Sequence, residues 1–358
     1  MQRYTFNILF FLAAVALVGL AQFGMLDKYA LTIITFMGIN CIFAVSLNLV
    51  NGYMGEFSCG HGGFMCVGAY AGSLISVAFF TDSKLFGSAL FPPELAPVLF
   101  PLVLLGATLA AALFGLVVAL PSFHTRDDYL AIITIAVNYI VISIVENIDA
   151  IGGPRGFSGM RKTVNAMSDV VNVPWMLIWT ILGLFVCVMT IYRLMTSTYG
   201  KGISAVRQNE VAAEIMGINT NRVKIMAFMV SSGLAGLAGA LYAHVYGYVN
   251  AQAFNILKST EGLVMVYLGG MGSISGVLLA AVAFTLLTEL LRFVIPWLDG
   301  VLHAMSLLPA GYELSQIWKW VIIPLILVLL MQFRPEGFLG NRELTQVFPW
   351  IKRWITFK

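Results

Sequence analysis

The side chains best suited to bind a polar solute lie in one glycine-dense segment, residues 48–64, between two apolar runs. This segment carries the amide of Asn48, the hydroxyl of Ser58 and the imidazole of His61. Glycine at this density opposes a continuous helix. A second glycine-rich break, residues 269–276, lies in the other half of the chain. Paired breaks of this kind in apolar segments indicate a transport pathway built from discontinuous helices.

A further polar turn, residues 151–159, combines glycine and proline with Arg155. It is either a plain solvated loop or a surface that meets an acidic partner. From the two breaks and this turn we expect the pathway to be lined by Asn48, Gly52, Gly55, Ser58, Gly60, His61, Gly152, Gly153, Gly269, Gly270 and Gly272. The alternative for each glycine is close helix packing, which we favour for the small residues at four-residue spacing, Gly68 with Gly72 and Ser232 with Gly236 and Ala240.

No enzyme or metal signature accompanies these residues. The sequence has no GxSxG or HExxH motif, and Gly200-Lys201 is followed by Gly202, so no phosphate-binding loop is present. The four histidines lie in separate segments, where a packing role is the more common one. The four cysteines fall in apolar stretches without CxxC spacing, which indicates buried, inert thiols and no metal site. We therefore expect no catalytic residue and no cofactor bound by this chain.

Composition defines the elements that must position these groups. The chain has 358 residues, 59% of them hydrophobic and 10% charged, with a mean hydropathy of +0.90, which excludes a soluble globule. A net charge of +3 is too dilute for a nucleic-acid groove. Apolar runs long enough to cross the bilayer as helices are expected at 7–24, 29–50, 57–80, 95–120, 129–148, 174–195, 223–247 and 316–333. We expect one all-α polytopic membrane domain covering residues 1–358.

Residues 262–296 are too long for one crossing and slightly short for two. Their glycine-rich centre predicts a broken pair or a re-entrant hairpin that enters and leaves on one face, ending near Pro296 and giving about ten crossings in total. Basic residues favour cytoplasmic loops, and the connections expected inside hold twelve of them: Arg3, Arg126, five in residues 193–224 and five in the tail, residues 334–358. Both termini are therefore expected in the cytoplasm, and the apolar run after Arg3 is interpreted as a first span rather than a signal peptide.

The longest expected cytoplasmic connection, residues 196–222, contains a short amphipathic helix. Asn209 can cap it, Glu210 occupies its first turn and Gly217 ends it. Val211 and Ala212 share one face with Ile215 and Met216. So short a helix is marginal alone in water, so we expect it to dock on a cytoplasmic partner or on the membrane. Near the other break, Glu289 and Arg292 are expected to pair on one helical face, and the scarcity of such groups argues against a proton-coupled carrier.

Six motifs together resemble the LivM-type inner-membrane permeases of bacterial high-affinity branched-chain amino acid ABC importers, and the resemblance covers most of the chain. The motifs are Leu47-Asn-Leu-Val-Asn-Gly52 with residues 55–64 and 68–70, Asp128-Tyr-Leu-Ala-Ile-Ile-Thr134, Gly152-Gly-Pro-Arg-Gly156, residues 202–213 with Gly217-Ile218, Ala235-Gly-Leu-Ala-Gly-Ala-Leu-Tyr242, and Leu268-Gly-Gly-Met-Gly-Ser273. The second motif adds Thr134 to the expected pathway. This sequence departs from the family pattern at Asp127 and at Asn138-Tyr139.

The resemblance implies a loop that couples transport to an ATPase, with Arg207, Glu210, Ala212, Ala213 and Gly217 at the matching positions. It implies a complex with a second, related permease, two ATP-binding cassette subunits that hold ATP and Mg²⁺, and a periplasmic substrate-binding protein. Branched-chain or other hydrophobic amino acids are the implied substrates. Urea or short amides are the alternative, and an ion-coupled secondary transporter is a more distant one.

Overall fold

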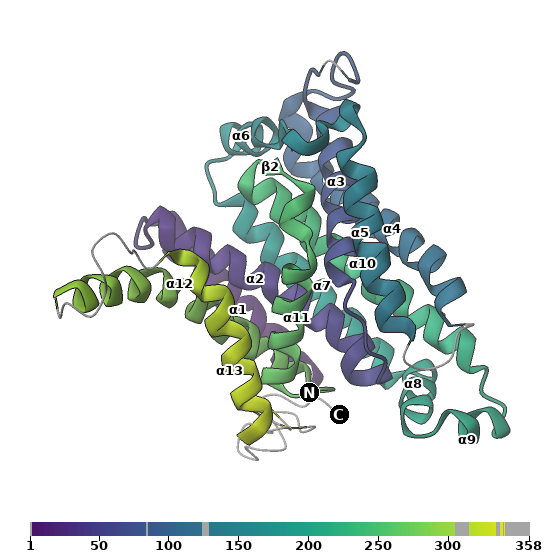
Figure 1. Cartoon of the computed structure of the whole chain (residues 1–358). Coiled ribbons are helices and arrows are strands. Elements are labelled where there is room, and N and C mark those ends of the chain that lie inside the picture. Colours follow the sequence, from purple (N-terminus) through teal and green to yellow (C-terminus); the bar gives the residue numbers. More distant parts are fainter. Residues whose placement is uncertain are drawn as a thin grey trace.

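The structure is a computed structural model that describes residues 2–83, 85–123, 129–304, 315–333, 337, 338 and 340. It is almost entirely helical, as the composition predicts (Figure 1). The α-helices are α1 (Gln2–Gln22), α2 (Lys28–Asn48), α3 (His61–Phe80), α4 (Ala96–Ser122), α5 (Tyr129–Glu146), α6 (Met160–Val170), α7 (Trp175–Thr196), α8 (Thr198–Gln208), α9 (Glu210–Ile215), α10 (Thr220–Tyr246), α11 (Ile256–Gly269), α12 (Ile274–Ala304) and α13 (Lys319–Phe333).

Short elements join these helices. A π-helical turn, η1 (Leu49–Met54), extends α2, and 3-10 turns are η2 (Pro93–Leu95), η3 (Asp149–Ile151), η4 (Gly153–Arg155), η5 (Ala251–Phe254) and η6 (Gln316–Trp318). Two strands of two residues, β1 (Phe157–Ser158) and β2 (Tyr248–Val249), pair antiparallel with Phe157 opposite Val249.

Six helical segments in the described part of the chain are long and apolar enough to cross a membrane, or seven if α5 and the bent turn after it form one span. The expected total of about ten crossings is therefore not confirmed. Two further apolar helical stretches, Phe10–Gln22 in α1 and Gln316–Ile326 in η6 and the start of α13, are shorter than a full crossing within the residues whose side chains are described. The multi-pass membrane character of the chain is supported, and the tail at 334–358 falls almost entirely outside the described residues.

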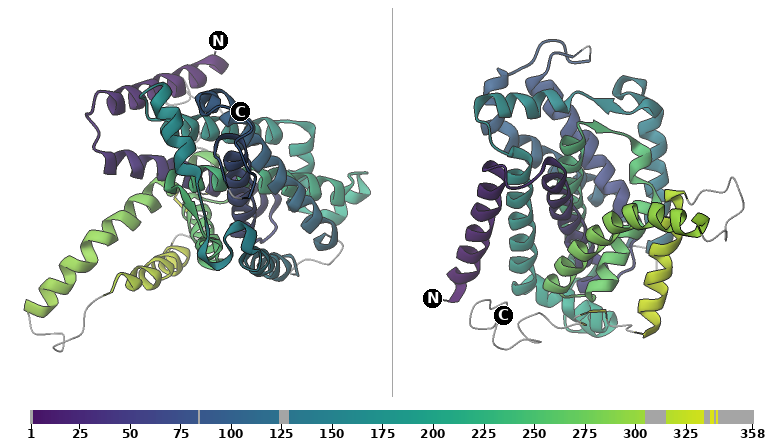
Figure 2. Two further views of the ribbon diagram at one scale, coloured as in Figure 1. Left: turned by 90° about the horizontal axis from the view of Figure 1, so that it is seen from above. Right: turned by 90° about the vertical axis from the view of Figure 1, so that its left-hand side faces the viewer.

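Helix α10 lies at the centre of the fold and packs against α2, α3 and α4 (Figures 1 and 2). Small residues allow the close contact. A Cβ atom on Gly68 would overlap the Gly236 backbone, and one on Gly72 would lie 2.8 Å from Ala240 Cβ. The packing role expected for these small residues is thus confirmed. In the core, the backbones of α3 and α10 are therefore almost in contact.

The C-terminal half differs from expectation in two places. Helix α11 begins at Ile256, before residue 262, because Asn255 Oδ1 caps it by accepting from Leu257 N at 3.0 Å. Helix α12 continues through Pro296 to Ala304, so the expected end at Pro296 is wrong. Pro296 cannot donate to the Arg292 carbonyl, and Gln316 Nε2 donates to that oxygen instead at 3.1 Å. The break predicted between the two helices is confirmed at residues 270–273.

The chain's first helix begins at the end of the molecule that carries α8 and α9, whereas α6 and β2 lie at the opposite end (Figures 1 and 2). Arg161, just beyond the polar turn at residues 151–159, lies in the first turn of α6. All four cysteines are buried and free, as predicted. Arg292 Nη1 lies 3.8 Å from Glu289 Oε2 on α12, which confirms the expected pairing of these two residues.

Candidate functional site: where the two breaks meet

The two glycine breaks, more than 200 residues apart in sequence, are in direct contact. Asn48, fully buried at the end of α2, accepts from Gly272 N at 3.0 Å through Oδ1 and donates to the Ser273 carbonyl at 3.4 Å. Gly52, in η1, has no room for a side chain, because a Cβ atom would overlap Asn48 Oδ1 and lie 2.5 Å from Gly272 N. Gly269 approaches Gly276 equally closely across the second break.

The first break reverses the chain between α2 and α3. Gly55 has a φ of +81°, which favours glycine, and the chain then runs without helix to His61. Gly60 lies against the Thr134 backbone of α5, where a Cβ would overlap the carbonyl, and Cys59 N donates to Thr134 Oγ1 at 3.2 Å. Burial raises the pKa of the Cys59 thiol, so it remains protonated at neutral pH.

Several buried polar atoms around this turn have no hydrogen-bond partner within the described residues. They are Ser58 Oγ, His61 Nδ1 and both amide atoms of Asn138. The other His61 nitrogen, Nε2, lies 3.0 Å from Ser46 Oγ, and the ring packs between Phe43 and Phe64. The histidine is thus a packing residue with one hydrogen bond.

The expected pathway residues from 48 to 61, Thr134 and 269–272 lie in one contiguous region.

Gly152 and Gly153 lie elsewhere. They form the turns after α5, next to β1, at the end of the molecule that carries α6 and β2 (Figure 1). Tyr248 OH donates to the Arg155 carbonyl at 2.6 Å, and Asn250 Nδ2 donates to the Pro154 carbonyl at 3.3 Å. These bonds tie the turn to the connection between α10 and α11. The structure therefore separates this turn from the contact between the two breaks.

The short helix in residues 196–222 forms as predicted. Asn209 caps α9 by accepting from Ala212 N at 2.9 Å, and Gly217 ends the segment with a φ of +83°. Val211, Ile215 and Met216 are 66%, 80% and 81% exposed. This apolar face is open in the isolated chain, while Ala213 on the opposite side is buried. Helix α8, which precedes α9 and packs against it, was not predicted.

An ion-pair cluster that sequence reasoning missed joins α9 to the first break. Lys224 Nζ, near the start of α10, lies 2.7 Å from Glu56 Oε1 and 2.8 Å from Glu210 Oε2. Glu56 belongs to the turn after η1, and Glu210 is the first residue of α9. Gly55 packs on Arg207, where a Cβ would lie 2.9 Å from Arg207 Cγ. The only sequence signal was a lysine inside an apolar helical run.

A family model described as the branched-chain amino acid transport system permease component matches residues 29–331 of the chain. The chain belongs to this family. It is 29% identical to the high-affinity branched-chain amino acid transport permease LivM of Escherichia coli, over 86% of this chain and 73% of that protein. It is 23% identical to the probable LivM of Methanocaldococcus jannaschii and to LivH of Salmonella typhimurium, over 87% and 88% of this chain and 93% and 95% of those proteins. No solved structure matches significantly.

In this permease, replacing Asn48 by leucine is expected to reduce substrate uptake about tenfold or more. The change leaves the Gly272 N–H and the Ser273 carbonyl without their partner, and a buried unpaired group costs about 1–3 kcal/mol. Asn48→Asp keeps the acceptor for Gly272 and should retain more activity. Uptake measured at matched membrane levels tests this expectation. Uptake by Asn48→Leu equal to that of the unmodified protein would show that the contact between the breaks is not needed.

Proposed function

We propose that this chain is the transmembrane permease subunit of an ATP-binding cassette importer that moves branched-chain amino acids into the cytoplasm. It works with a second, related permease, two ATPase subunits that hold ATP and Mg²⁺, and a periplasmic binding protein. Both termini and α8–α9 face the cytoplasm of a bacterial inner membrane. The family assignment and the names of the LivM and LivH relatives support the substrate class.

The observation that carries this proposal is the arrangement around α9. Its apolar face is exposed, and a helix of six residues gains stability when such a face is covered. On its other side, Glu210 binds Lys224, which also binds Glu56 in the glycine-dense turn. A partner that moves α9 therefore acts directly on the first break. This is the connection that an ATP-driven permease needs, because the sequence has no phosphate-binding loop.

Ile215→Glu is expected to abolish ATP-driven uptake of L-leucine while leaving the chain inserted. Ile215 is 80% exposed, so the charge disturbs no internal packing but opposes docking of an apolar surface. The matched control is Phe86→Glu, also at an exposed position, in the connection between α3 and α4. The measurement is uptake in proteoliposomes that contain the ATPase subunits, with co-purification of those subunits as a second readout.

Several outcomes would reject the proposal. Normal uptake and normal co-purification in the Ile215→Glu variant would reject the docking role of α9. Uptake without ATP, driven by an ion gradient, would favour a secondary transporter. Transport of urea but not of L-leucine by the unmodified complex would reassign the substrate.

A further inference from the structure

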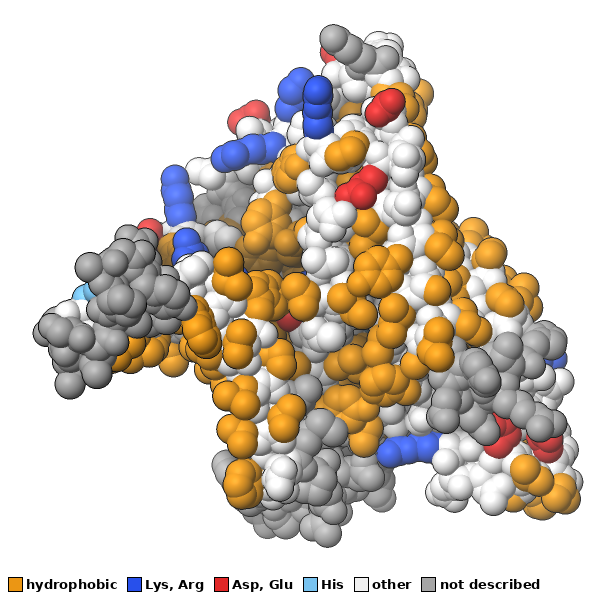
Figure 3. All heavy atoms as spheres, viewed as in Figure 1, with side chains coloured by type: hydrophobic (Ala, Val, Ile, Leu, Met, Phe, Trp, Pro, Cys, Tyr) orange, Lys and Arg blue, Asp and Glu red, His pale blue; other side chains and the backbone are white. Residues whose placement is uncertain are grey.

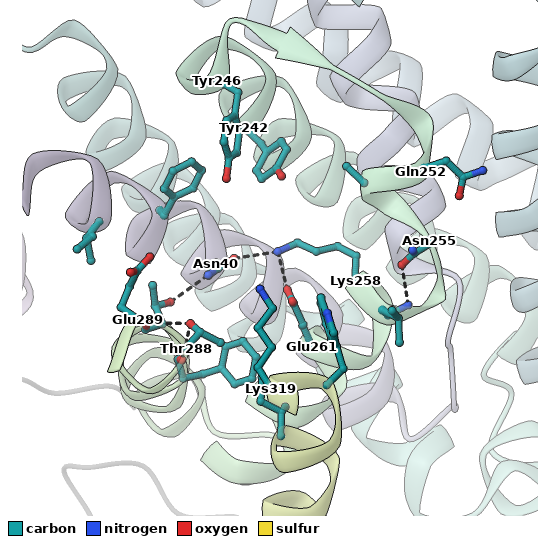
Figure 4. A pocket seen from close by; sticks show the side chains of 18 residues that line it. Asn40, Tyr242, Tyr246, Gln252, Asn255, Lys258, Glu261, Thr288, Glu289 and Lys319 are labelled. Atoms are coloured by element: carbon teal, nitrogen blue, oxygen red, sulfur yellow. Dashed lines mark hydrogen bonds and ion pairs between the residues drawn. The ribbon is translucent and has the colours of Figure 1, made fainter. Parts of the chain in front are cut away.

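A cavity of about 350 Å³ lies apart from the contact between the breaks, among α2, α10, α11, α12 and α13 (Figure 4). The space-filling view shows the molecule hollowed in this region, where α12 and α13 diverge from the central helices (Figure 3). Its volume is at the lower end of the range for small-molecule sites. The cavity is therefore of a size for a small solute.

Four charged side chains border the cavity: Lys258, Glu261, Glu289 and Lys319. The side chains of Lys258 and Glu261 are 13% and 15% exposed and pair at 2.8 Å. Charged groups among apolar membrane helices are costly, and where they occur they mark solute pathways. The expected segments ended at residue 247 and resumed at residue 262, which placed Lys258 in the connection between them. In the structure it lies in the first turn of α11 beside Asn40, in the middle of α2.

The charges that line the cavity sum to zero. Lys258 and Glu261 pair with each other on α11, whereas Glu289 lies on α12 and Lys319 on α13. Lys258 Nζ has three N–H donors, and two go to Glu261 Oε2 at 2.8 Å and Asn40 Oδ1 at 3.4 Å. Among the described residues, one donor remains for a ligand. Glu289, on α12, accepts from Tyr29 OH at 2.7 Å and pairs with Arg292 Nη1 at 3.8 Å, both through Oε2. Its Oε1 therefore remains as an acceptor within the described part of the chain. A site with separated charges and no net charge suits a zwitterion better than a simple anion or cation.

The rest of the wall is apolar or aromatic. Phe36 from α2 and Phe284 from α12 border the cavity together with Ile323 of α13. The hydroxyl ends of Tyr242 and Tyr246 point toward Lys258 and Glu289 from above (Figure 4). Such a wall can hold an aliphatic side chain while the tyrosines provide additional hydrogen bonds.

We propose that this cavity binds the zwitterion of an aliphatic L-amino acid, with Lys258 binding its carboxylate and Glu289 its ammonium group. The inference rests on the proposed function and adds the residues that select the substrate. Asn40 and Glu261 are positioning residues, because they hold the Lys258 ammonium in place. A ligand that lacks either charge leaves one charged group of the site without its partner and binds more weakly.

The test is equilibrium binding of radiolabelled L-leucine to the purified complex without its binding protein. Lys258→Met and Glu289→Gln are each expected to raise the dissociation constant about tenfold or more. Thr288→Phe fills the cavity and keeps all four charges, so it separates loss of the site from loss of a structural ion pair. Lys162→Met and Glu94→Gln, at exposed positions that do not line the cavity, are the matched controls. Competition by 4-methylpentanoate, which lacks the ammonium group, should be weak in the unmodified protein.

The outcomes distinguish the proposed binding site from the proposed importer function. Unchanged affinity in Lys258→Met, Glu289→Gln and Thr288→Phe, all properly assembled, would overturn the site while leaving the importer function intact. Absence of L-leucine binding by a complex that transports it would also overturn the site. A complex with ATPase activity that transports no amino acid at all would instead reject the proposed function.

Discussion

Replacing Gly68 by leucine is expected to prevent accumulation of the folded permease. Gly68 of α3 faces Gly236 of α10 so closely that even a single methyl group would overlap the opposing backbone. Backbone cannot give way as a flexible side chain can, so α3 and α10 must separate. Overpacking of a tight interface typically costs about 1–3 kcal/mol and occasionally more, and here the clash lies in the centre of the core. The measurement is the monodisperse fraction after detergent extraction, followed by fluorescence size-exclusion chromatography.

Gly19→Leu is the matched control for this experiment. Gly19 is also inside an apolar helix, but nothing lies within 4 Å of the position its Cβ would take. The control should accumulate normally, since leucine also has the higher helix propensity. Equal recovery of both variants would show that the α3–α10 interface tolerates separation, which contradicts the packing described above.

Lys224→Met is expected to lower both stability and ATP-driven uptake. The change leaves Glu56 and Glu210, which now share one ammonium group, as two unpaired carboxylates that repel each other. Removing one partner of a buried ion pair costs about 3–5 kcal/mol. The Glu210 side chain is 35% exposed, so the lower end of this range is expected. Thermal unfolding of the purified complex and its uptake rate are the measurements.

A second substitution makes this prediction specific. Adding Glu56→Gln to Lys224→Met removes one of the repelling charges, so the double variant should be more stable than Lys224→Met alone. Uptake should not recover with stability, because the link between α9 and the glycine-dense turn stays broken. Recovery of full uptake in the double variant would show that the cluster has only a structural role.

The local signals in the sequence were sufficient for local structure. The cap at Asn209, the stop at Gly217 and the break before Ser273 depend on residues a few positions apart, and each was predicted correctly. Contacts between distant segments were not predictable in this way. Nothing near Lys224 in the sequence indicates Glu56, which is brought to it only when α2 and α10 pack together.

The same limit explains the other differences. Pro296 is a helix-ending signal, but Gln316 from a distant turn satisfies the carbonyl that proline leaves free. Lys258 was not placed in a helix because the cap at Asn255 that begins α11 was missed. One of its partners, Glu261, is only one helical turn ahead, whereas the other, Asn40, lies on α2. Distant partners therefore explain the Pro296 case and the contact of Lys258 with Asn40, and they leave no pattern in the neighbouring residues.

The length and stiffness of helix α10 have a mechanical consequence. Its 27 residues form a rod about 40 Å long, with Lys224 near one end and Tyr242 and Tyr246 near the other. Small residues let α10 pack closely against α3 and α4, and this packing leaves the helix little freedom to bend. In the proposed importer, an ATPase subunit that displaces α9 also displaces Lys224, and the stiff helix carries this movement to the tyrosines beside the cavity. ATP hydrolysis by that subunit would thereby change the contacts of a bound solute without any change of charge along α10.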